Sequence, residues 1–222
     1  MLAKTALFIH RSVGRNLLHD GRVRELLKAA KAPLILDDYD QNIDVLTTES
    51  GRTKLGLNFP GGDTRPQDYA AIFSAQRAES SAPILELALS YDRIVIKSCY
   101  PNSHITSDEQ LEAVKGHYQS IARFFADHAT KQLIIVTSPP LVPLKTNPAA
   151  ARRARILATW LADSKLGQNV SVFNLFDQLA APESEPGANL LRRPYRRWLP
   201  LDSHPNARAS REVAPRFVKR LG

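Results

Sequence analysis

Short apolar runs alternate along this chain with longer stretches of helical periodicity, and this alternation constrains the fold more than any other feature. The runs that predict buried strands cover residues 6–9, 33–36, 93–97, 133–136 and 170–173. Helical patterns separate these runs, which is typical of parallel βαβ units. The sequence therefore predicts a doubly wound parallel sheet of five strands in a single α/β domain over residues 1–222.

The segments between the runs predict helices and one long loop. Helices are expected at residues 16–30, with Gly21 in the middle, at 67–76, at 82–89, after Ser107, after Asn147 and from Asn206 to the end. Residues 37–66 are polar and lack periodicity, so they predict a long loop. Long ordered loops in compact domains often carry function.

Composition sets limits on the cellular setting. No apolar run approaches the roughly 20 residues that span a bilayer, so no membrane partner is expected. The N-terminal apolar residues predict a buried first strand rather than a signal peptide, because they are few and no small-residue cleavage site follows. The single cysteine, Cys99, excludes an internal disulfide and favours a reducing compartment, which predicts a cytoplasmic protein.

The formal net charge is +8, with arginine concentrated at residues 152–155 and 192–220. One interpretation is attraction to anionic partners. The other interpretation, which we favour, is that these arginines lie on solvated helix faces. Nucleic acid is therefore not expected as a partner. The sequence carries no signal for an oligomeric state.

Several chemistry-bearing residues follow the predicted strands. Ser12 follows the first, Gly61 and Gly62 lie in the loop after the second, and Asn102 follows the third. Asp202 and His204 come just before the last helix. Ligands of doubly wound sheets bind beyond the carboxyl ends of the strands. All these residues are therefore expected at one edge of the sheet.

A serine, a histidine and an acid are the minimum set for acyl transfer. In this interpretation Ser12 is the nucleophile, His204 the base and Asp202 the acid that orients the base. Each also has an ordinary structural reading, as a helix cap or a surface residue. Cys99 is a rival nucleophile, although buried structural cysteines are common. No metal site and no cofactor are predicted.

An acyl-transfer site also needs donors for the oxyanion. The candidates are the backbone N–H of Ser12, a backbone N–H of Gly61 or Gly62, and the side-chain amide of Asn102. The alternatives are a flexible turn for the glycines and an ordinary turn asparagine for Asn102.

Serine, glycine, asparagine and histidine in this order, each after its expected strand, resemble the SGNH (GDSL-like) hydrolase superfamily. The resemblance covers essentially the whole chain. It implies a flavodoxin-like three-layer α/β/α sandwich with strand order 2-1-3-4-5 and hydrolysis of esters or acyl groups. It also implies the roles already given to Ser12, Gly61 or Gly62, Asn102 and His204.

Three departures from the family pattern stand out. His-Arg-Ser replaces the usual Gly-Asp-Ser at residues 10–12, and Cys-Tyr-Pro-Asn replaces Gly-x-Asn-Asp at residues 99–102. The acid Asp202 lies two residues before the histidine instead of three, so a backbone carbonyl is an alternative partner for His204. These departures leave the substrate class open.

The sequence thus predicts a serine hydrolase acting on a small-molecule or glycan ester, with an O-acetyl group among the candidates. Arg11 and Arg15 flank the nucleophile and are candidates to bind an anionic group of that substrate. They are equally suited to pair with Asp37, Asp38 or Asp40. The alternative functions are a catalytically silent module that binds an anionic glycan or nucleic acid, and acyl transfer to a sugar hydroxyl.

Overall fold

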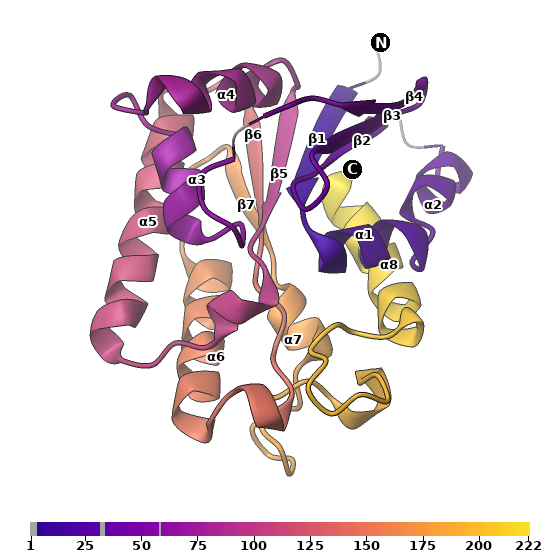
Figure 1. The fold of residues 1–222 in the computed structure, drawn as a ribbon, viewed down its shortest axis with the longest axis vertical. Helices are drawn as coiled ribbons and strands as arrows, with labels where there is room; N and C mark the ends of the chain where they lie inside the picture. Colours follow the sequence, from indigo (N-terminus) through magenta and orange to yellow (C-terminus); the bar gives the residue numbers. More distant parts are fainter. Residues whose placement is uncertain (1–3, 32–33, 58) are drawn as a thin grey trace.

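The computed structural model describes residues 4–31, 34–57 and 59–222. A seven-stranded sheet forms its centre, in the order β4-β3-β2-β1-β5-β6-β7 (Figure 1). The strands are β1 (Lys4–His10), β2 (Leu34–Asp40), β3 (Val45–Thr48), β4 (Gly51–Lys54), β5 (Arg93–Lys97), β6 (Gln132–Val136) and β7 (Val170–Phe173). The five strands β2, β1, β5, β6 and β7 are parallel, while β3 and β4 are antiparallel.

The α/β class and the parallel order 2-1-3-4-5 agree with the prediction, but the count of five strands is wrong. Two antiparallel strands, β3 and β4, extend the sheet beyond β2 where a loop was expected. Their side chains are half-buried or exposed, so they carry no apolar run that a sequence reading could detect. The predicted start of the second strand, Pro33, lies outside the described residues.

Strand β2 also continues further than its apolar residues indicate. Asp37, Asp38 and Asp40 are buried and remain in register with β1. Each carboxylate has a partner from another element: Asp37 accepts from the Tyr91 hydroxyl at 2.8 Å, and Asp38 and Asp40 pair with basic side chains. These partners come from distant parts of the chain, so the local sequence reads as a loop although the backbone is a strand.

Helices cover both faces of the sheet and give the predicted three layers (Figure 1). They are α1 (Ser12–His19), α2 (Val23–Ala29), α3 (Pro66–Ile72), α4 (Ala82–Leu89), α5 (Asp108–Ala126), α6 (Pro148–Asp163), α7 (Leu175–Leu179) and α8 (Ala207–Leu221). Short 3-10 turns are η1 (Glu79–Ser81), η2 (Tyr100–Ser103), η3 (Pro143–Lys145) and η4 (Arg193–Tyr195). Among the described residues, none of these helices is long and apolar enough to cross a membrane.

The two faces have separate hydrophobic cores, and β1 contributes to both. Ala6 and Phe8 face α1, α2, α7 and α8, whereas Leu7 and Ile9 face α3 to α6. Successive side chains of a strand point to opposite faces, and a strand that is buried on both faces needs a continuous apolar run. This requirement explains why the first run was readable from the sequence.

The prediction of one helix at residues 16–30 is wrong, because the helix begins earlier and is interrupted. The chain forms α1 from Ser12 and then α2 from Val23, with a turn between them. Arg22 closes that turn with a left-handed backbone, φ +55°. Both helices pack against α8, which a single straight helix could not do with the same residues.

Candidate active site

Ser12 lies where β1 ends and α1 begins, at the carboxyl edge of the sheet. Arg11, in extended conformation, occupies the cap position before the helix and makes no side-chain capping bond. Ser12 is the first helical residue, so it does not cap the helix, which was the structural alternative for this serine. Its Oγ lies 2.8 Å from Nε2 of His204, a residue 192 positions further along the chain. The two ends of the sequence therefore meet at this hydroxyl.

His204 is held by Asp202 through two contacts. The Asp202 Oδ1 lies 2.6 Å from the ring Nδ1 and also accepts from the His204 backbone N–H at 2.9 Å. The carboxylate selects the tautomer with the proton on Nδ1, which leaves Nε2 to accept from the serine hydroxyl. The partner of the ring is thus the acid and not a backbone carbonyl, even with the short spacing.

The carboxyl of Asp202 is suited to remain ionised. Its burial raises the pKa, but hydrogen bonds from His204 and the charges of His204 and Arg197 lower it below its ordinary value. Arg197 lies 3.7 Å from the second carboxylate oxygen. A carboxylate that stays charged can stabilise the positive imidazolium that forms when His204 takes a proton.

The backbone around His204 is fixed by neighbouring segments. The buried Ser203 accepts a bond from the Val142 N–H at 3.2 Å. Asn206 caps α8 by accepting from the Ala209 N–H at 3.1 Å, and its amide donates to the Pro194 and Arg196 carbonyls. The base therefore sits on a loop that is anchored on both sides.

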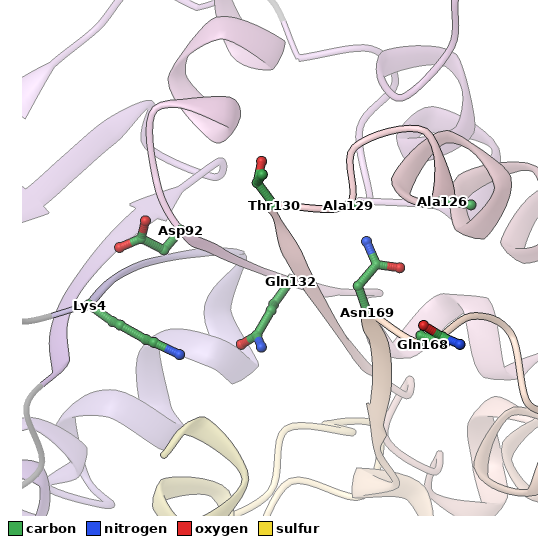
Figure 2. Close-up of a pocket in the computed structure, with 8 residues that line it drawn as sticks. All are labelled: Lys4, Asp92, Ala126, Ala129, Thr130, Gln132, Gln168 and Asn169. Atoms are coloured by element: carbon green, nitrogen blue, oxygen red, sulfur yellow. The ribbon is translucent and has the colours of Figure 1, made fainter.

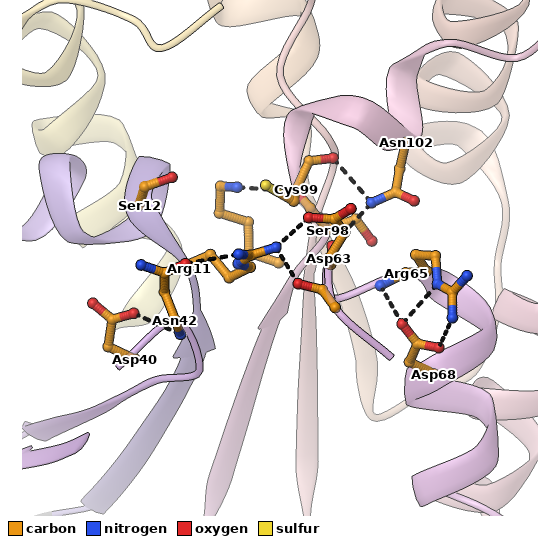
Figure 3. A network of polar contacts seen from close by, with 12 residues as sticks. Arg11, Ser12, Asp40, Asn42, Asp63, Arg65, Asp68, Ser98, Cys99 and Asn102 are labelled. Carbon is orange, nitrogen blue, oxygen red and sulfur yellow. Dashed lines mark hydrogen bonds and ion pairs between the residues drawn. The ribbon is translucent and has the colours of Figure 1, made fainter. Parts of the chain in front are cut away.

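Asn102 and the glycine pair come to the same edge, with their polar groups engaged. The Asn102 amide donates to the carbonyl oxygens of Asp63 and Cys99, each at 3.1 Å (Figure 3). Gly61 has φ +68°, and a side chain there would lie within 2.5 Å of the Asp68 carboxylate. The Gly62 carbonyl accepts from Arg11. The oxyanion roles of these groups stay predictions.

Arg11 and Arg15 both pair with acidic or amide groups of the protein. Figure 3 shows Arg11 between Asn42 and Asp63, and the structure gives it an ion pair with Asp63 and a 2.7 Å bond to Asn42. Arg15 binds Asp40 at 2.5 Å, one of the three partners that the sequence offered. Their role in binding a substrate stays a prediction. The Asp63 partner of Arg11 was missed because it lies 52 residues away.

Two comparisons by sequence find nothing: no protein-family model matches the chain, and no curated protein matches it. Solved structures do share its fold. A GDSL-like lipase from Bacteroides thetaiotaomicron has a TM-score of 0.58 at 12% identity, over 99% of this chain and 87% of the other. A candidate acylhydrolase from Bacteroides fragilis has a TM-score of 0.55 at 13% identity, over 98% of this chain and 88% of the other.

The chain thus has a GDSL-like fold. The resemblance drawn from four short sequence blocks is therefore confirmed for the fold. Identities of 12% and 13% carry no further than the fold. The catalytic roles of Ser12, His204 and Asp202 stay predictions.

Sequence reasoning missed two residues that touch the candidate site of this GDSL-like fold. The ring of Tyr100 meets the His204 ring edge-on, with centroids 5.0 Å apart. Arg197 lies beside Asp202, as described above. The signals were present, since Tyr100 precedes Asn102 in the same turn and Arg197 belongs to an arginine cluster, but nothing local indicates what either side chain contacts. Cys99, the rival nucleophile, is buried.

An open pocket of about 830 Å³ lies at the end of the sheet opposite to the candidate site, where β1 and β6 begin. Figure 2 shows Lys4, Asp92, Gln132 and Asn169 around it. It contains no paired nucleophile and base, and it does not include the candidate catalytic residues. This large volume therefore does not coincide with the candidate active site. Within the described residues, no group of three or more histidine, cysteine or acidic side chains is arranged to hold a metal ion.

Proposed function

We propose that this protein is a serine hydrolase that cleaves an ester or acyl group, with O-acetyl esters among the candidates. The observation that carries the proposal is the run of contacts from Ser12 to His204 to Asp202, at 2.8 Å and 2.6 Å. Hydroxyl, imidazole and carboxylate in this order are what nucleophilic acyl transfer requires. The GDSL-like fold supports the same proposal, because the two similar structures are named as a lipase and a candidate acylhydrolase.

In the first half of the proposed reaction, Ser12 Oγ attacks the acyl carbon and its proton passes to His204 Nε2. The tetrahedral intermediate collapses, the bond to the leaving oxygen breaks, and His204 returns the proton to that oxygen to release an alcohol. In the second half a water molecule attacks the acyl carbon while His204 takes its proton; the bond to Ser12 Oγ then breaks, and His204 returns the proton to that oxygen. The products are the free acid, the alcohol and the original enzyme.

The developing oxyanion needs donors in place before the reaction. The Ser12 N–H lies in the first turn of α1, where backbone N–H groups have no intrahelical acceptor and negative charge is favoured. A Gly61 or Gly62 N–H and the Asn102 amide are the further proposed donors. Because the Asn102 amide already donates to two carbonyls, a substrate oxygen has to compete with them.

The test is covalent labelling with a fluorophosphonate, followed by mapping of the modified residue. Wild-type protein should be labelled at Ser12 and should hydrolyse a short-chain aryl ester. Ser12→Ala should abolish labelling and lower turnover by about 10³-fold or more, with an almost unchanged melting temperature.

Two control variants separate the assignments. Cys99→Ser should keep both labelling and turnover, since the thiol has no part in the proposed reaction. Ser50→Ala, an exposed serine in the β3–β4 turn, should match the wild type. Turnover that survives in Ser12→Ala, or labelling that maps to another residue, contradicts the proposal.

A second candidate function is a silent binding module of the same fold. The His-Arg-Ser sequence in place of the family's first block and the net charge of +8 favour it. Salt-sensitive binding to heparin or RNA, without labelling or turnover, is the outcome that supports this alternative.

A further inference from the structure

Large apolar side chains are exposed around the candidate site. Trp198 is 88% exposed, Leu144 66%, Leu201 57% and Leu199 47%. We call these four residues the rim patch. The other large apolar residues that are exposed in the described structure, Ile43 and Ile156, lie elsewhere in the chain. Scattered apolar residues are normal on a surface, but a group of them beside a functional site marks an interaction surface.

The two segments of the rim patch lie next to each other. The 141–145 segment is joined to the loop before α8 by the bond from the Val142 N–H to Ser203 Oγ. A second bond joins the Leu191 N–H to the Leu141 carbonyl at 2.9 Å. Asp202 directly follows Leu201, and His204 is three residues from it, so the rim patch borders the Ser12–His204 contact. In Figure 1 the connection between α7 and α8 lies at the end of the sheet where β1 and β5 end.

Basic residues flank the rim patch in both of its segments, and the acid that directly follows it, Asp202, is paired with Arg197. Lys145, Arg193 and Arg197 are exposed, and Arg196 is half-buried. Residues 189–201 and 138–150 contain no aspartate or glutamate. The surface thus offers projecting apolar side chains and positive charge together, which is complementary to a surface with an apolar interior and negative headgroups.

We propose that the rim patch docks this protein onto an anionic lipid bilayer. Tryptophan favours the boundary between water and acyl chains, and arginine and lysine keep their charge among the headgroups while their stems lie on apolar surface. Trp198 and its leucine neighbours project outward, which suits insertion into a soft interface. Pro194, Pro200 and the Asn206 anchor stiffen the loop, so little conformational entropy is lost on insertion.

This docking differs from the expectation of no membrane partner, which rests on the lack of a spanning segment. A peripheral contact needs no span. Docking would place the candidate active-site edge toward the lipid surface. The binding itself does not require the proposed hydrolysis, so a Ser12→Ala variant binds vesicles as the wild type does.

The test is binding to large unilamellar vesicles, followed by sedimentation and by quenching of tryptophan fluorescence with brominated acyl chains. Vesicles of phosphatidylcholine with phosphatidylglycerol should bind the protein, and vesicles of phosphatidylcholine alone should bind it much less. Trp198→Ala should weaken binding by about fivefold or more, because one large apolar side chain no longer inserts. It should also abolish quenching by the brominated chains, because the one tryptophan left, Trp160 of α6, lies outside the rim patch.

Charge is tested with two matched double variants. Lys145→Glu/Arg193→Glu reverses two charges beside the rim patch and should weaken binding by about tenfold or more. Lys219→Glu/Arg220→Glu lowers the net charge equally at the far end of α8 and should have a much smaller effect.

Ile156→Ala removes an exposed apolar side chain from α6, outside the rim patch, and should bind like the wild type.

The outcomes decide between occupants. No binding to anionic vesicles overturns the proposal, as does equal weakening by both charge variants, because binding would then follow net charge alone. Self-association that Trp198→Ala abolishes, without vesicle binding, identifies a second copy of the chain as the occupant and also overturns it. Vesicle binding by a wild-type protein that neither hydrolyses the aryl ester nor reacts with the fluorophosphonate supports docking while contradicting the proposed function.

Discussion

Ionisable side chains are buried beneath the candidate site, and they differ in the partners that surround them. His10 is fully buried, and its ring nitrogens face the Arg11 carbonyl at 2.9 Å and the Asp38 carboxylate at 3.0 Å. Burial raises the pKa of Asp38, but His10 and Arg24 lower it below its ordinary value. Lys97 has no such partner: its Nζ donates to the Ser98 carbonyl at 2.9 Å, and no carboxylate lies within ion-pair distance in the described structure.

Lys97 should therefore cost stability at neutral pH. Burial lowers its pKa to about 8, whereas the unfolded chain keeps the ordinary 10.5. Between these values the unfolded state binds more protons, so wild-type stability rises with pH across this window, and the penalty is complete below pH 8. Lys97→Met should raise the free energy of unfolding by about 1–3 kcal/mol at pH 7, and this gain should shrink toward pH 10.5.

Urea unfolding of both proteins at several pH values checks this prediction. Lys28→Met, at an exposed position of α2, is the control and should show no such pH dependence. A Lys97→Met protein that is less stable than the wild type at every pH would mean that the ammonium group is well compensated in the fold.

At the scale of elements, the position of Ser12 depends on how closely α1 approaches β1. A Cβ atom on Gly14 would lie 2.4 Å from the Cβ and 2.5 Å from the Cγ of His10. The His10 ring cannot move aside easily, because both of its nitrogens are bonded. Gly14 therefore sets the spacing between the strand and the helix whose first residue is the candidate nucleophile.

Gly14→Ala should lower the free energy of unfolding by about 1–3 kcal/mol through overpacking and should slow fluorophosphonate labelling of Ser12, because α1 shifts away from His204. Urea unfolding and labelling rates measure the two effects. Gly116→Ala in α5 is the matched control: its new Cβ meets nothing within 4 Å, so the change should stabilise the helix by about 0.5–1 kcal/mol. Equal stability of Gly14→Ala and the wild type would show that this spacing is not fixed.

Elements with a local cause could be predicted from the sequence, and those with a distant cause could not. The fully buried strand β5 and the capped starts of α5, α6 and α8 carry their signals in adjacent residues. The extension of β2 depends on partners up to 54 residues away, as for Tyr91 and Asp37. At the site, the Ser12–His204–Asp202 set could be proposed from order along the chain, whereas the engagement of Asn102 with Asp63 needed coordinates.

At the scale of the whole molecule, the sheet is shared by two cores, and the candidate site is made where the first strand meets the last helix. Phe217 of α8 is fully buried and packs on Phe8 of β1 and Phe173 of β7, with ring centroids 5.4 Å and 5.2 Å apart. Trp160 of α6 packs against the core on the opposite face. Since β1 has side chains in both cores, neither face should unfold without the other.

A substitution in the core on one face should therefore lower the stability of both faces equally. Phe217→Leu removes part of a buried ring and should lower the free energy of unfolding by about 1 kcal/mol. In a Trp198→Ala background, where Trp160 is the one tryptophan left, the urea midpoint should fall by the same amount whether it is followed by fluorescence or by far-UV circular dichroism, as a single two-state domain requires. Arg211→Ala, at an exposed position of the same helix, should leave both midpoints unchanged. A fluorescence midpoint that stays in place while the dichroism midpoint falls would mean that α8 detaches separately, and the site it completes would then be lost before the rest of the fold.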